Sequence, residues 1–277
     1  MPGAVAVIGA LVDRAEWRWM QHRRHGTPDG TRVVAGIRVR ELGRGSPTIV
    51  LAADPPNVIE HLAEVAEALA ERHRVVCIEM PGFGYSSPDA SLGRMLGELD
   101  AAPYALALPC VAGLISATLA AEYPTLVSHV IGVQSPGLAS VQAWAARVDR
   151  RGLIRTRGLG QAMVALTRRR LARGWYDVAV ADPARRPKYL AGALAAFDAG
   201  ATYPLASALQ SFAQLAPPPP IAQPTLLVWG ARDPTHRKTP RDGLAPGARV
   251  VELASAGHFP ELEDVAGFVA AVTAFLK

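Results

Sequence analysis

The sequence contains few cysteines, few lysines and few aromatic residues, and it has no long uninterrupted apolar run. Its 277 residues include two cysteines, Cys77 and Cys110, too few for a disulfide framework, which favours a reducing, cytoplasmic setting. No apolar stretch reaches the about 20 residues that span a bilayer. No basic residue precedes the first apolar run, and Asp13 interrupts it soon after. The sequence therefore predicts neither a signal peptide nor a membrane anchor.

The charge is positive and comes mainly from arginine. The net charge is +5 and the pI about 9.5, with basic clusters at 14–24, 147–157, 168–173 and 185–188. Aromatic residues do not alternate with these clusters as in nucleic-acid-binding proteins, so we do not expect a nucleic-acid partner. Two interpretations remain: solvated helix faces, or a docking surface for an acidic partner such as a carrier protein or an anionic substrate.

Apolar patterning predicts strands that alternate with helices. Short apolar runs indicate buried strands, at 47–53, 74–80, 105–109, 127–136 and 224–233, and residues 32–40 alternate in part, as a strand does. Residues 248–258 are interpreted as the last strand and the loop that follows it. Helical spacing occurs at 4–23, 58–73, 112–124 and 265–277. The turn-forming sequence at 27–30 predicts an N-terminal hairpin. This alternation is typical of an α/β protein with a mostly parallel sheet.

One long segment breaks the alternation. Residues 138–216 are helical and arginine-rich in pattern, and four prolines at 217–220 follow them. We interpret 138–216 as a helical cap inserted into a core formed by 1–137 and 217–277.

Candidate functional residues follow the predicted strands, because chemistry in open parallel sheets gathers at the carboxyl ends of the strands. Cys110, Asp233 and His258 each follow such a strand. The order nucleophile, acid, histidine is that of a hydrolase triad. A cysteine at the start of a helix is favoured as thiolate, an imidazole can accept its proton, and a carboxylate can orient the imidazole.

Four segments together resemble the α/β-hydrolase superfamily. They are "HRVVCIEMPGFGYSSP", "ALALPCVAGLISATLAAEYP", "PTLLVWGARDP" and "SAGHFPELE", which resemble the family's glycine-rich loop, nucleophile elbow, acid turn and histidine loop. The likeness covers roughly residues 30–137 and 220–277. It implies an α/β-hydrolase fold in which the backbone N–H of Val111 helps to stabilise an oxyanion. The superfamily includes members with a cysteine nucleophile, among them dienelactone hydrolases and Dieckmann cyclases.

Three departures from the family pattern bear on the chemistry. Cys110 replaces the usual serine, and Leu108 stands where a glycine usually relieves crowding. Pro55 stands where a backbone N–H normally reaches the oxyanion, and proline has no N–H. Glu79, followed by Met80, replaces the usual aspartate before Pro81. These departures argue against a fast general esterase and favour an activated substrate such as a thioester.

Other residues are assigned with open alternatives. Asp54 is either a turn residue or an acid/base or amine-binding group that faces Cys110. Trp175 and Tyr203 in the predicted cap are candidates for an apolar substrate pocket that also includes Pro55. His236 is expected to be solvated. The pattern predicts no metal and no cofactor.

The sequence thus predicts an enzyme of covalent acyl transfer. The thiolate of Cys110 attacks an ester or thioester, and the acyl group passes to water or to a nucleophile within the substrate, as in a Dieckmann-type cyclisation of specialised metabolism. The alternative is a non-covalent lyase, isomerase or cyclase that uses His258 and Asp54. A binding protein with a degenerate site is the third hypothesis.

Overall fold

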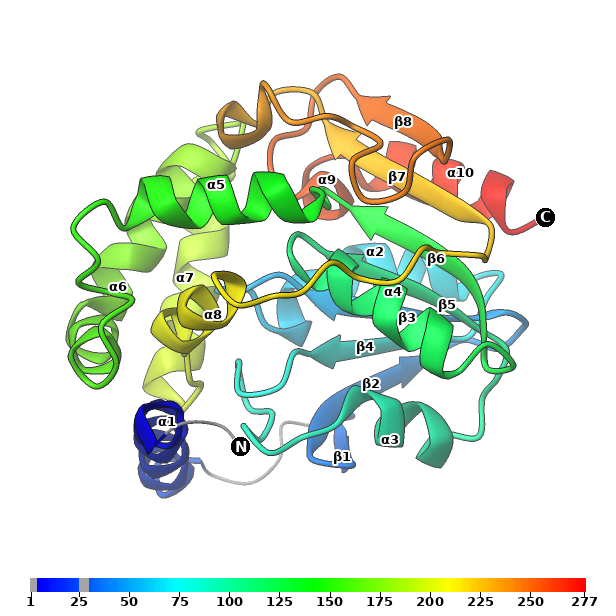
Figure 1. The fold of residues 1–277 in the computed structure, drawn as a ribbon. Coiled ribbons are helices and arrows are strands. Elements are labelled where there is room, and N and C mark those ends of the chain that lie inside the picture. The colour runs from blue at the N-terminus through cyan, green and yellow to red at the C-terminus, as the bar shows by residue number, and fades with distance from the viewer. Residues whose placement is uncertain (1–3, 25–29) are drawn as a thin grey trace.

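The computed structural model describes residues 4–24 and 30–277 and contains one eight-stranded sheet flanked by helices (Figure 1). The strands lie in the order β1-β2-β4-β3-β5-β6-β7-β8. The strand bounds are β1 Arg32–Val34, β2 Ile37–Leu42, β3 Thr48–Ala53, β4 Val75–Glu79, β5 Tyr104–Pro109, β6 Val127–Val133, β7 Thr225–Gly230 and β8 Arg249–Leu253. All pairs from β4 to β8 are parallel, and the pairs β1–β2 and β2–β4 are antiparallel.

Helices cover both faces of this sheet. One apolar cluster joins the sheet to α2, α9 and α10, and a second joins its other face to α3 and α4. The helix bounds are α1 Ala4–Gln21, α2 Ala63–Ala70, α3 Leu92–Glu98, α4 Ala112–Glu122, α5 Leu138–Val148, α6 Leu159–Ala179, α7 Arg186–Asp198, α8 Leu205–Phe212, α9 Pro260–Glu263 and α10 Val265–Phe275, with short 3₁₀ helices η1 Ile59–Leu62 and η2 Pro234–His236. The predicted α/β-hydrolase architecture is confirmed.

Several predicted strands differ in their bounds. The strand expected over 32–40 is a hairpin, because Ala35 and Gly36 both have positive φ and reverse the chain between β1 and β2. The turn predicted at 27–30 lies almost entirely outside the described residues. β6 ends at Val133 rather than 136, because Gln134 takes a φ of 51° and leaves the sheet. The last strand ends at Leu253, and a loop continues to His258.

The segment 138–216 contains four helices, α5 to α8, which lie together beyond the carboxyl ends of the parallel strands (Figure 1). The N-terminal helix α1 packs against this group. Arg168 Nη1 of α6 donates a 2.9 Å hydrogen bond to Glu16 Oε1 of α1. The helical content predicted for 138–216 is therefore present, and the division of the chain into core and cap stays a prediction.

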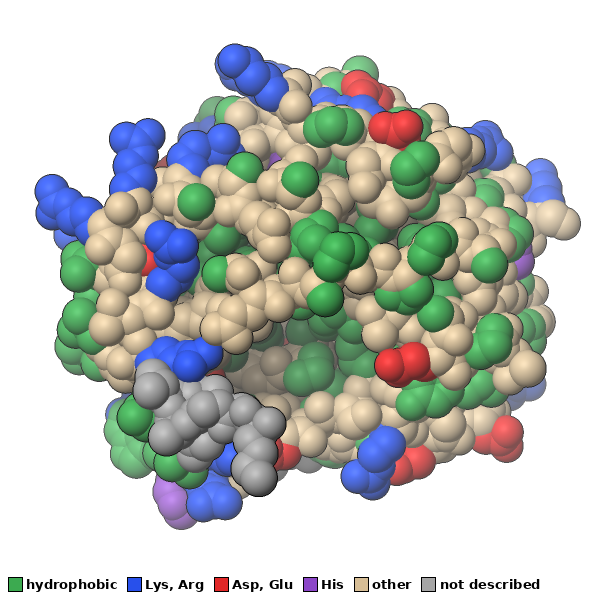
Figure 2. Space-filling view, in the orientation of Figure 1, with side chains coloured by type: hydrophobic (Ala, Val, Ile, Leu, Met, Phe, Trp, Pro, Cys, Tyr) green, Lys and Arg blue, Asp and Glu red, His purple; other side chains and the backbone are tan. Residues whose placement is uncertain are grey.

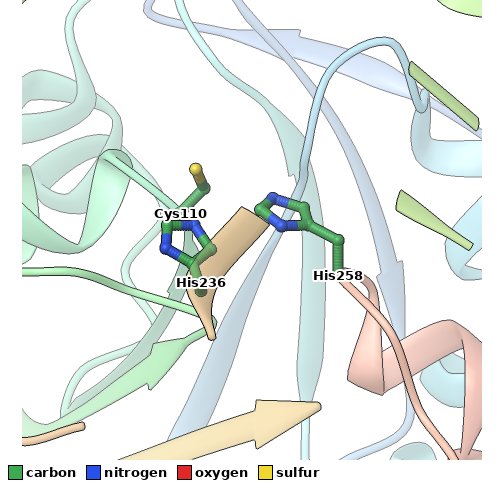
Figure 3. Close-up of side chains that lie close together, drawn as sticks. All are labelled: Cys110, His236 and His258. Atoms are coloured by element: carbon green, nitrogen blue, oxygen red, sulfur yellow. The ribbon is translucent and has the colours of Figure 1, made fainter. Parts of the chain in front are cut away.

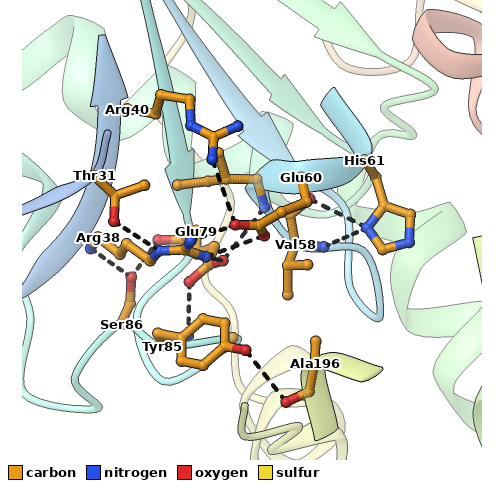
Figure 4. A network of polar contacts seen from close by, with 12 residues as sticks. Thr31, Arg38, Arg40, Val58, Glu60, His61, Glu79, Tyr85, Ser86 and Ala196 are labelled. Atoms are coloured by element: carbon orange, nitrogen blue, oxygen red, sulfur yellow. Dashed lines mark hydrogen bonds and ion pairs between the residues drawn. The ribbon is translucent and has the colours of Figure 1, made fainter. Parts of the chain in front are cut away.

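A buried ion-pair network fixes the loop after β4 (Figure 4). Arg38 Nη1 donates to Glu79 Oε1 at 2.8 Å, and the backbone N–H groups of Ile59 and Tyr85 donate to the same carboxylate at 3.3 and 2.6 Å. The carboxylate occupies the space where a side chain at Gly84 would lie, and Gly84 has a φ of +58°. Glu79 thus acts as a structural anchor that holds the glycine-rich loop against the sheet.

Candidate active site

Cys110 lies on a sharp turn between β5 and α4. Its φ is 51°, in the left-handed region that non-glycine residues rarely adopt. Its N–H donates to Val133 O at 2.8 Å, and the Gly113 N–H donates to Cys110 O at 3.1 Å. The turn therefore has the strained strand-to-helix geometry of a nucleophile elbow. Leu108, where the family has a small residue, points into the core between sheet and helices.

The acid and the histidine of the predicted triad are in contact. His258 Nδ1 donates to Asp233 Oδ2 at 2.7 Å. Gln134 Nε2 donates to the same oxygen at 2.7 Å, and the N–H and Oγ1 of Thr235 donate to Asp233 Oδ1, both at 2.7 Å. Both carboxylate oxygens are thus occupied, which fixes the plane of the carboxylate and, through it, the His258 tautomer.

The loop that bears His258 is held by hydrogen bonds to Glu263 of α9 and to the end of α6. Glu263 Oε1 accepts hydrogen bonds from the Gly257 and Phe259 N–H groups, and Glu263 Oε2 accepts one from Ala181. The His258 N–H itself donates to Ala179 O at 2.8 Å. The end of α6 and the histidine loop therefore form one hydrogen-bonded unit that holds the imidazole over the sheet.

Asp54 and Pro55 lie on the opposite side of the imidazole, after β3. Asp54 Oδ2 is 3.2 Å from His258 Nε2. The two atoms are at ion-pair distance, but they are not aligned as a hydrogen bond, so Nε2 has no hydrogen-bond partner among the described residues. Pro55 lines the same cavity as Cys110, and it has no N–H to offer an oxyanion.

The charged groups of the site shift one another's pKa values. Burial lowers the pKa of His258, but the Asp233 and Asp54 carboxylates outweigh it and hold the His258 pKa well above its ordinary value. Burial raises the pKa of the Cys110 thiol, Asp54 raises it further, and His258 and the Val111 N–H act against them. Burial opposes ionisation of Asp233, yet His258 holds its pKa below its usual range. The site therefore favours an imidazolium between two carboxylates.

His236 completes the site and was not predicted to take part in it. It was expected to be solvated, but it is buried, and its ring stacks on His258 with centroids 5.4 Å apart and planes at 18°. The expectation was wrong because η2 turns the residue inward after Asp233. Figure 3 shows His236 and His258 beside Cys110; the thiol and one ring nitrogen of each histidine lie within 4.8 Å of one another.

A cavity of about 850 Å³ opens in front of these residues, within the range of small-molecule sites. Figure 2 shows a hollow on this face, with hydrophobic side chains inside it. The predicted residues Asp54, Pro55, Cys110, Val111, Trp175 and Tyr203 all line it. Trp175 also packs edge-on against His258, with centroids 4.8 Å apart. Asp233 lies behind the imidazole, away from the cavity lining.

Two site residues had weak signals in the sequence. Gln134 donates to Asp233, but it follows β6 directly and no local pattern distinguishes it from its neighbour Ser135, whose Oγ donates to Leu108 O and Val133 O. His236 follows Asp233 by three residues, and this spacing on a 3₁₀ turn was the only signal that could have placed it in the site.

Comparison with known proteins places this fold among the α/β hydrolases. The Alpha/beta hydrolase family matches residues 56–271, and the chain belongs to this family. It is accordingly an enzyme of the hydrolase type. None of the curated protein sequences is similar enough to count as a match.

Solved structures share the fold at low sequence identity. A candidate acyltransferase from Salmonella enterica has a TM-score of 0.73 at 18% identity, over 91% of this chain and 97% of that chain. A bromoperoxidase from Bacillus anthracis has a TM-score of 0.64 at 17% identity, over 89% and 99%. The esterase RhEst1 from Rhodococcus sp. ECU1013 has a TM-score of 0.63 at 18% identity, over 89% and 98%. Across residues 4–24 and 30–277, no helix is both long and apolar enough to span a membrane.

Proposed function

We propose that the protein is an acyl-transfer enzyme in which Cys110 is the nucleophile. The observation that carries this proposal is the position of the thiol, on a turn with a φ of 51° at the start of α4, beside an imidazole that Asp233 holds at 2.7 Å. A core cysteine would not need this backbone strain, whereas a nucleophile gains exposure to the cavity from it.

The reaction has two steps. Sγ attacks the acyl carbonyl and forms a C–S bond, and the thiol proton passes to the coupled pair of Asp54 and His258. The His258 imidazolium then protonates the leaving group as its bond to the acyl carbon breaks. Water, or a nucleophile within the same substrate, attacks the resulting thioester and releases the Cys110 thiol. Hydrolysis and ring closure share this intermediate.

The substrate side of the site favours an activated acyl group. The Val111 N–H is one oxyanion donor, but Pro55 removes the second, a loss worth on the order of 10²–10³ in rate in an enzyme that depends on it. The Asp54 carboxylate adds negative charge near the same position. A thioester tolerates these losses better than an ester, because its carbonyl is more reactive and a thiol is a better leaving group than an alcohol, so its departure depends less on the proton from His258.

The substrate would be a small molecule with a medium to large apolar acyl chain, delivered by an acidic carrier protein. Exposed arginines that form no ion pair with described residues lie on α5, on α6 and in the segment between them: Arg147, Arg150, Arg151, Arg170 and Arg173. Arg170 also lines the cavity, and Figure 2 shows basic side chains along the edge of the face where these helices lie. Such a field attracts an acidic carrier protein to the cavity mouth.

The test uses an acyl thioester and the mass of the intact protein. We expect hexanoyl-N-acetylcysteamine to acylate the wild-type protein once, and Cys110→Ala to lose both the adduct and turnover, by a factor on the order of 10⁴–10⁶. Cys77→Ser is the matched control and keeps both, because Cys77 lies mid-strand in the core. Turnover by Cys110→Ala near the wild-type rate would reject the covalent route.

A second candidate function rests on the position of Asp54. Its Oδ2 lies 3.2 Å from His258 Nε2, and Asp54 lines the same cavity as Cys110. Asp54 and His258 could therefore remove and return protons in an elimination, isomerisation or ring closure without an acyl-enzyme. In that case Asp54→Asn abolishes turnover, and Cys110→Ala leaves most of it.

A further inference from the structure

We propose that the catalytic cavity also holds a binding site for a soft divalent metal ion, of the Zn²⁺ class, formed by Cys110, His236 and His258. The thiol and one ring nitrogen of each histidine lie within 4.8 Å of one another (Figure 3). Thiolate and imidazole are the ligands that Zn²⁺ prefers. This inference is independent of the acyl-transfer proposal, since metal binding requires only these three side chains.

Each histidine is oriented as a metal ligand would be. His258 Nδ1 faces Asp233 Oδ2 at 2.7 Å, and His236 Nδ1 faces Thr239 Oγ1 at 3.0 Å. An oxygen acceptor on Nδ1 keeps a proton there, so Nε2 is the ring nitrogen left for a ligand; at His258 the metal ion would displace the proton that Nε2 carries in the imidazolium form. Both rings are at least nine-tenths buried, so their orientation is set by packing and does not have to be found when a metal arrives.

The Nε2 atom of His258 supplies an independent sign of a ligand. It is buried and faces the cavity, and its contact with Asp54 Oδ2 is an ion pair without the alignment of a hydrogen bond, although buried polar atoms are nearly always hydrogen-bonded. A metal ion would satisfy it. Asp54 Oδ2, 3.2 Å from this nitrogen, is at about the 3.3 Å spacing of two ligands around a tetrahedral zinc with bonds of about 2.0 Å.

The site needs one small adjustment. The largest separation in the cluster, 4.8 Å, exceeds the about 3.5 Å between a sulfur and a nitrogen ligand of zinc. Cys110 is partly exposed to the cavity, so its side chain can rotate toward the histidines without displacing core atoms. Asp54 or a water molecule then provides the fourth ligand, with Cys110, His236 and His258 as the other three.

The proposed metal and the acyl-enzyme exclude each other, because both require the Cys110 sulfur. Bound Zn²⁺ would hold the protein in an inactive state, and removal of the ion would release the nucleophile. His236 separates the two functions: the metal site uses it directly, whereas the acyl-transfer steps do not route a proton through it.

The test follows metal binding by a signal other than activity. We expect the full chain, freed of metal by a chelator, to bind one Co²⁺ with a thiolate-to-cobalt charge-transfer band and tetrahedral visible bands, and Zn²⁺ to displace it. His236→Asn should weaken affinity for Zn²⁺ by at least about 10–100-fold, the loss that even an outer partner of a ligand causes. Cys110→Ser should lose the charge-transfer band while it keeps weaker binding.

Two controls keep the outcome interpretable. Cys77→Ser and His129→Asn change the same residue types outside the cavity and should leave the Co²⁺ spectrum unchanged; circular dichroism shows whether each variant is folded. A missing charge-transfer band in the wild-type protein, or a band that survives in Cys110→Ser and disappears in Cys77→Ser, would overturn the proposal. Inhibition of thioester turnover by Zn²⁺, relieved in His236→Asn, is a separate readout that requires the acyl-transfer activity.

Discussion

The two sides of the His258 imidazole differ in how completely their polar groups are partnered. On the relay side, defined as Asp233, Gln134 and Thr235 with His258 Nδ1, every carboxylate oxygen accepts hydrogen bonds. On the cavity side, defined as Cys110, Asp54 and Pro55 with His258 Nε2, the imidazole nitrogen has no hydrogen-bond partner among the described residues, and Pro55, which has no N–H, lines the cavity. The fold therefore holds the Asp233 carboxylate and the His258 ring in place, and it leaves His258 Nε2 available to hydrogen-bond or coordinate a ligand in the cavity.

This difference shows where the protein departs from a general hydrolase. The relay side retains what an α/β hydrolase needs to orient a histidine. Cys110 and Pro55, which depart from the family pattern, line the cavity, so under the proposed function they bear on the substrate rather than on the orientation of His258. Four substitutions test this difference between the two sides and the burial around them, in order of decreasing expected effect.

Asp233→Asn should lower kcat for hexanoyl-N-acetylcysteamine by about 10⁴, because the amide can present its N–H to His258 and impose the wrong tautomer. Steady-state kinetics measure the loss. Asp242→Asn, which changes an exposed carboxylate in the same loop, is the matched control and should keep the wild-type rate. A loss below tenfold in Asp233→Asn would mean that the relay side does not serve the reaction.

Glu261→Gln should stabilise the protein at neutral pH. Glu261 is buried with both carboxyl oxygens unpartnered among the described residues, and burial raises its pKa from 4.5 to about 8. Between these values the unfolded chain loses a proton that the folded chain keeps, so stability falls as pH rises. At pH 7 the penalty that glutamine removes is about 3 kcal/mol.

Urea unfolding at pH 4.5 and pH 7.5 measures this gain. The gain should be close to zero at the lower pH and full at the higher one. Glu122→Gln, on the exposed face of α4, should change little at either pH. Equal effects of Glu261→Gln at both pH values would show that the carboxyl is not held neutral.

Gln134→Leu should destabilise the relay side by about 2 kcal/mol. It removes a hydrogen bond to the charged Asp233 and leaves the Gly230 N–H, which donates to Gln134 Oε1 at 2.8 Å, without its acceptor. Urea unfolding measures the loss, and kcat should fall with it because the carboxylate can rotate. Gln142→Leu, which breaks a partly exposed 3.5 Å contact, is the control. An equal loss of unfolding free energy in this variant would show that the contacts of Gln134 with Asp233 and Gly230 add no particular stability.

Asp54→Asn should make the Cys110 thiol more reactive, by about threefold to tenfold at pH 7. Burial is the main cause of the raised Cys110 pKa and Asp54 is the second, so removal of the charge lowers the pKa and increases the thiolate fraction. The rate of iodoacetamide alkylation against pH measures the shift. Cys77, with a pKa raised by burial to about 12, serves as an internal control and should stay unreactive.

The same pH profile tests whether the effect on Cys110 is specific to Asp54 or common to carboxylates that line the cavity. Asp13→Asn changes another carboxylate that lines the cavity, and it should leave the alkylation profile of Cys110 in place. If Asp54→Asn slows alkylation instead, Asp54 acts as the base that accepts the Cys110 proton. The cavity side would then contain a proton acceptor of its own, as the relay side does.

From the sequence alone one could predict the alternation of strands and helices, except α3 and the division of 32–40 into β1 and β2. The position of Cys110 on a turn and its association with Asp233 and His258 could also be predicted, because buried strands and turns leave local signals in apolar runs and in glycine and proline. Asp54 and Pro55 could be placed after a strand in the same way. Their consequence for the oxyanion could also be stated, since the lack of an N–H in proline does not depend on context.

Only the tertiary structure decided how the side chains meet. The stacking of His236 on His258, the hydrogen bond from Gln134 to Asp233, and the carboxylate of Asp54 at 3.2 Å from Nε2 join segments distant in sequence. A local pattern carries no record of such contacts, because each depends on where two independently formed loops end over the sheet. The strand bounds at Ala35 and Val133 shifted for the same reason, since a positive φ at single residues ends a strand that hydropathy alone would extend.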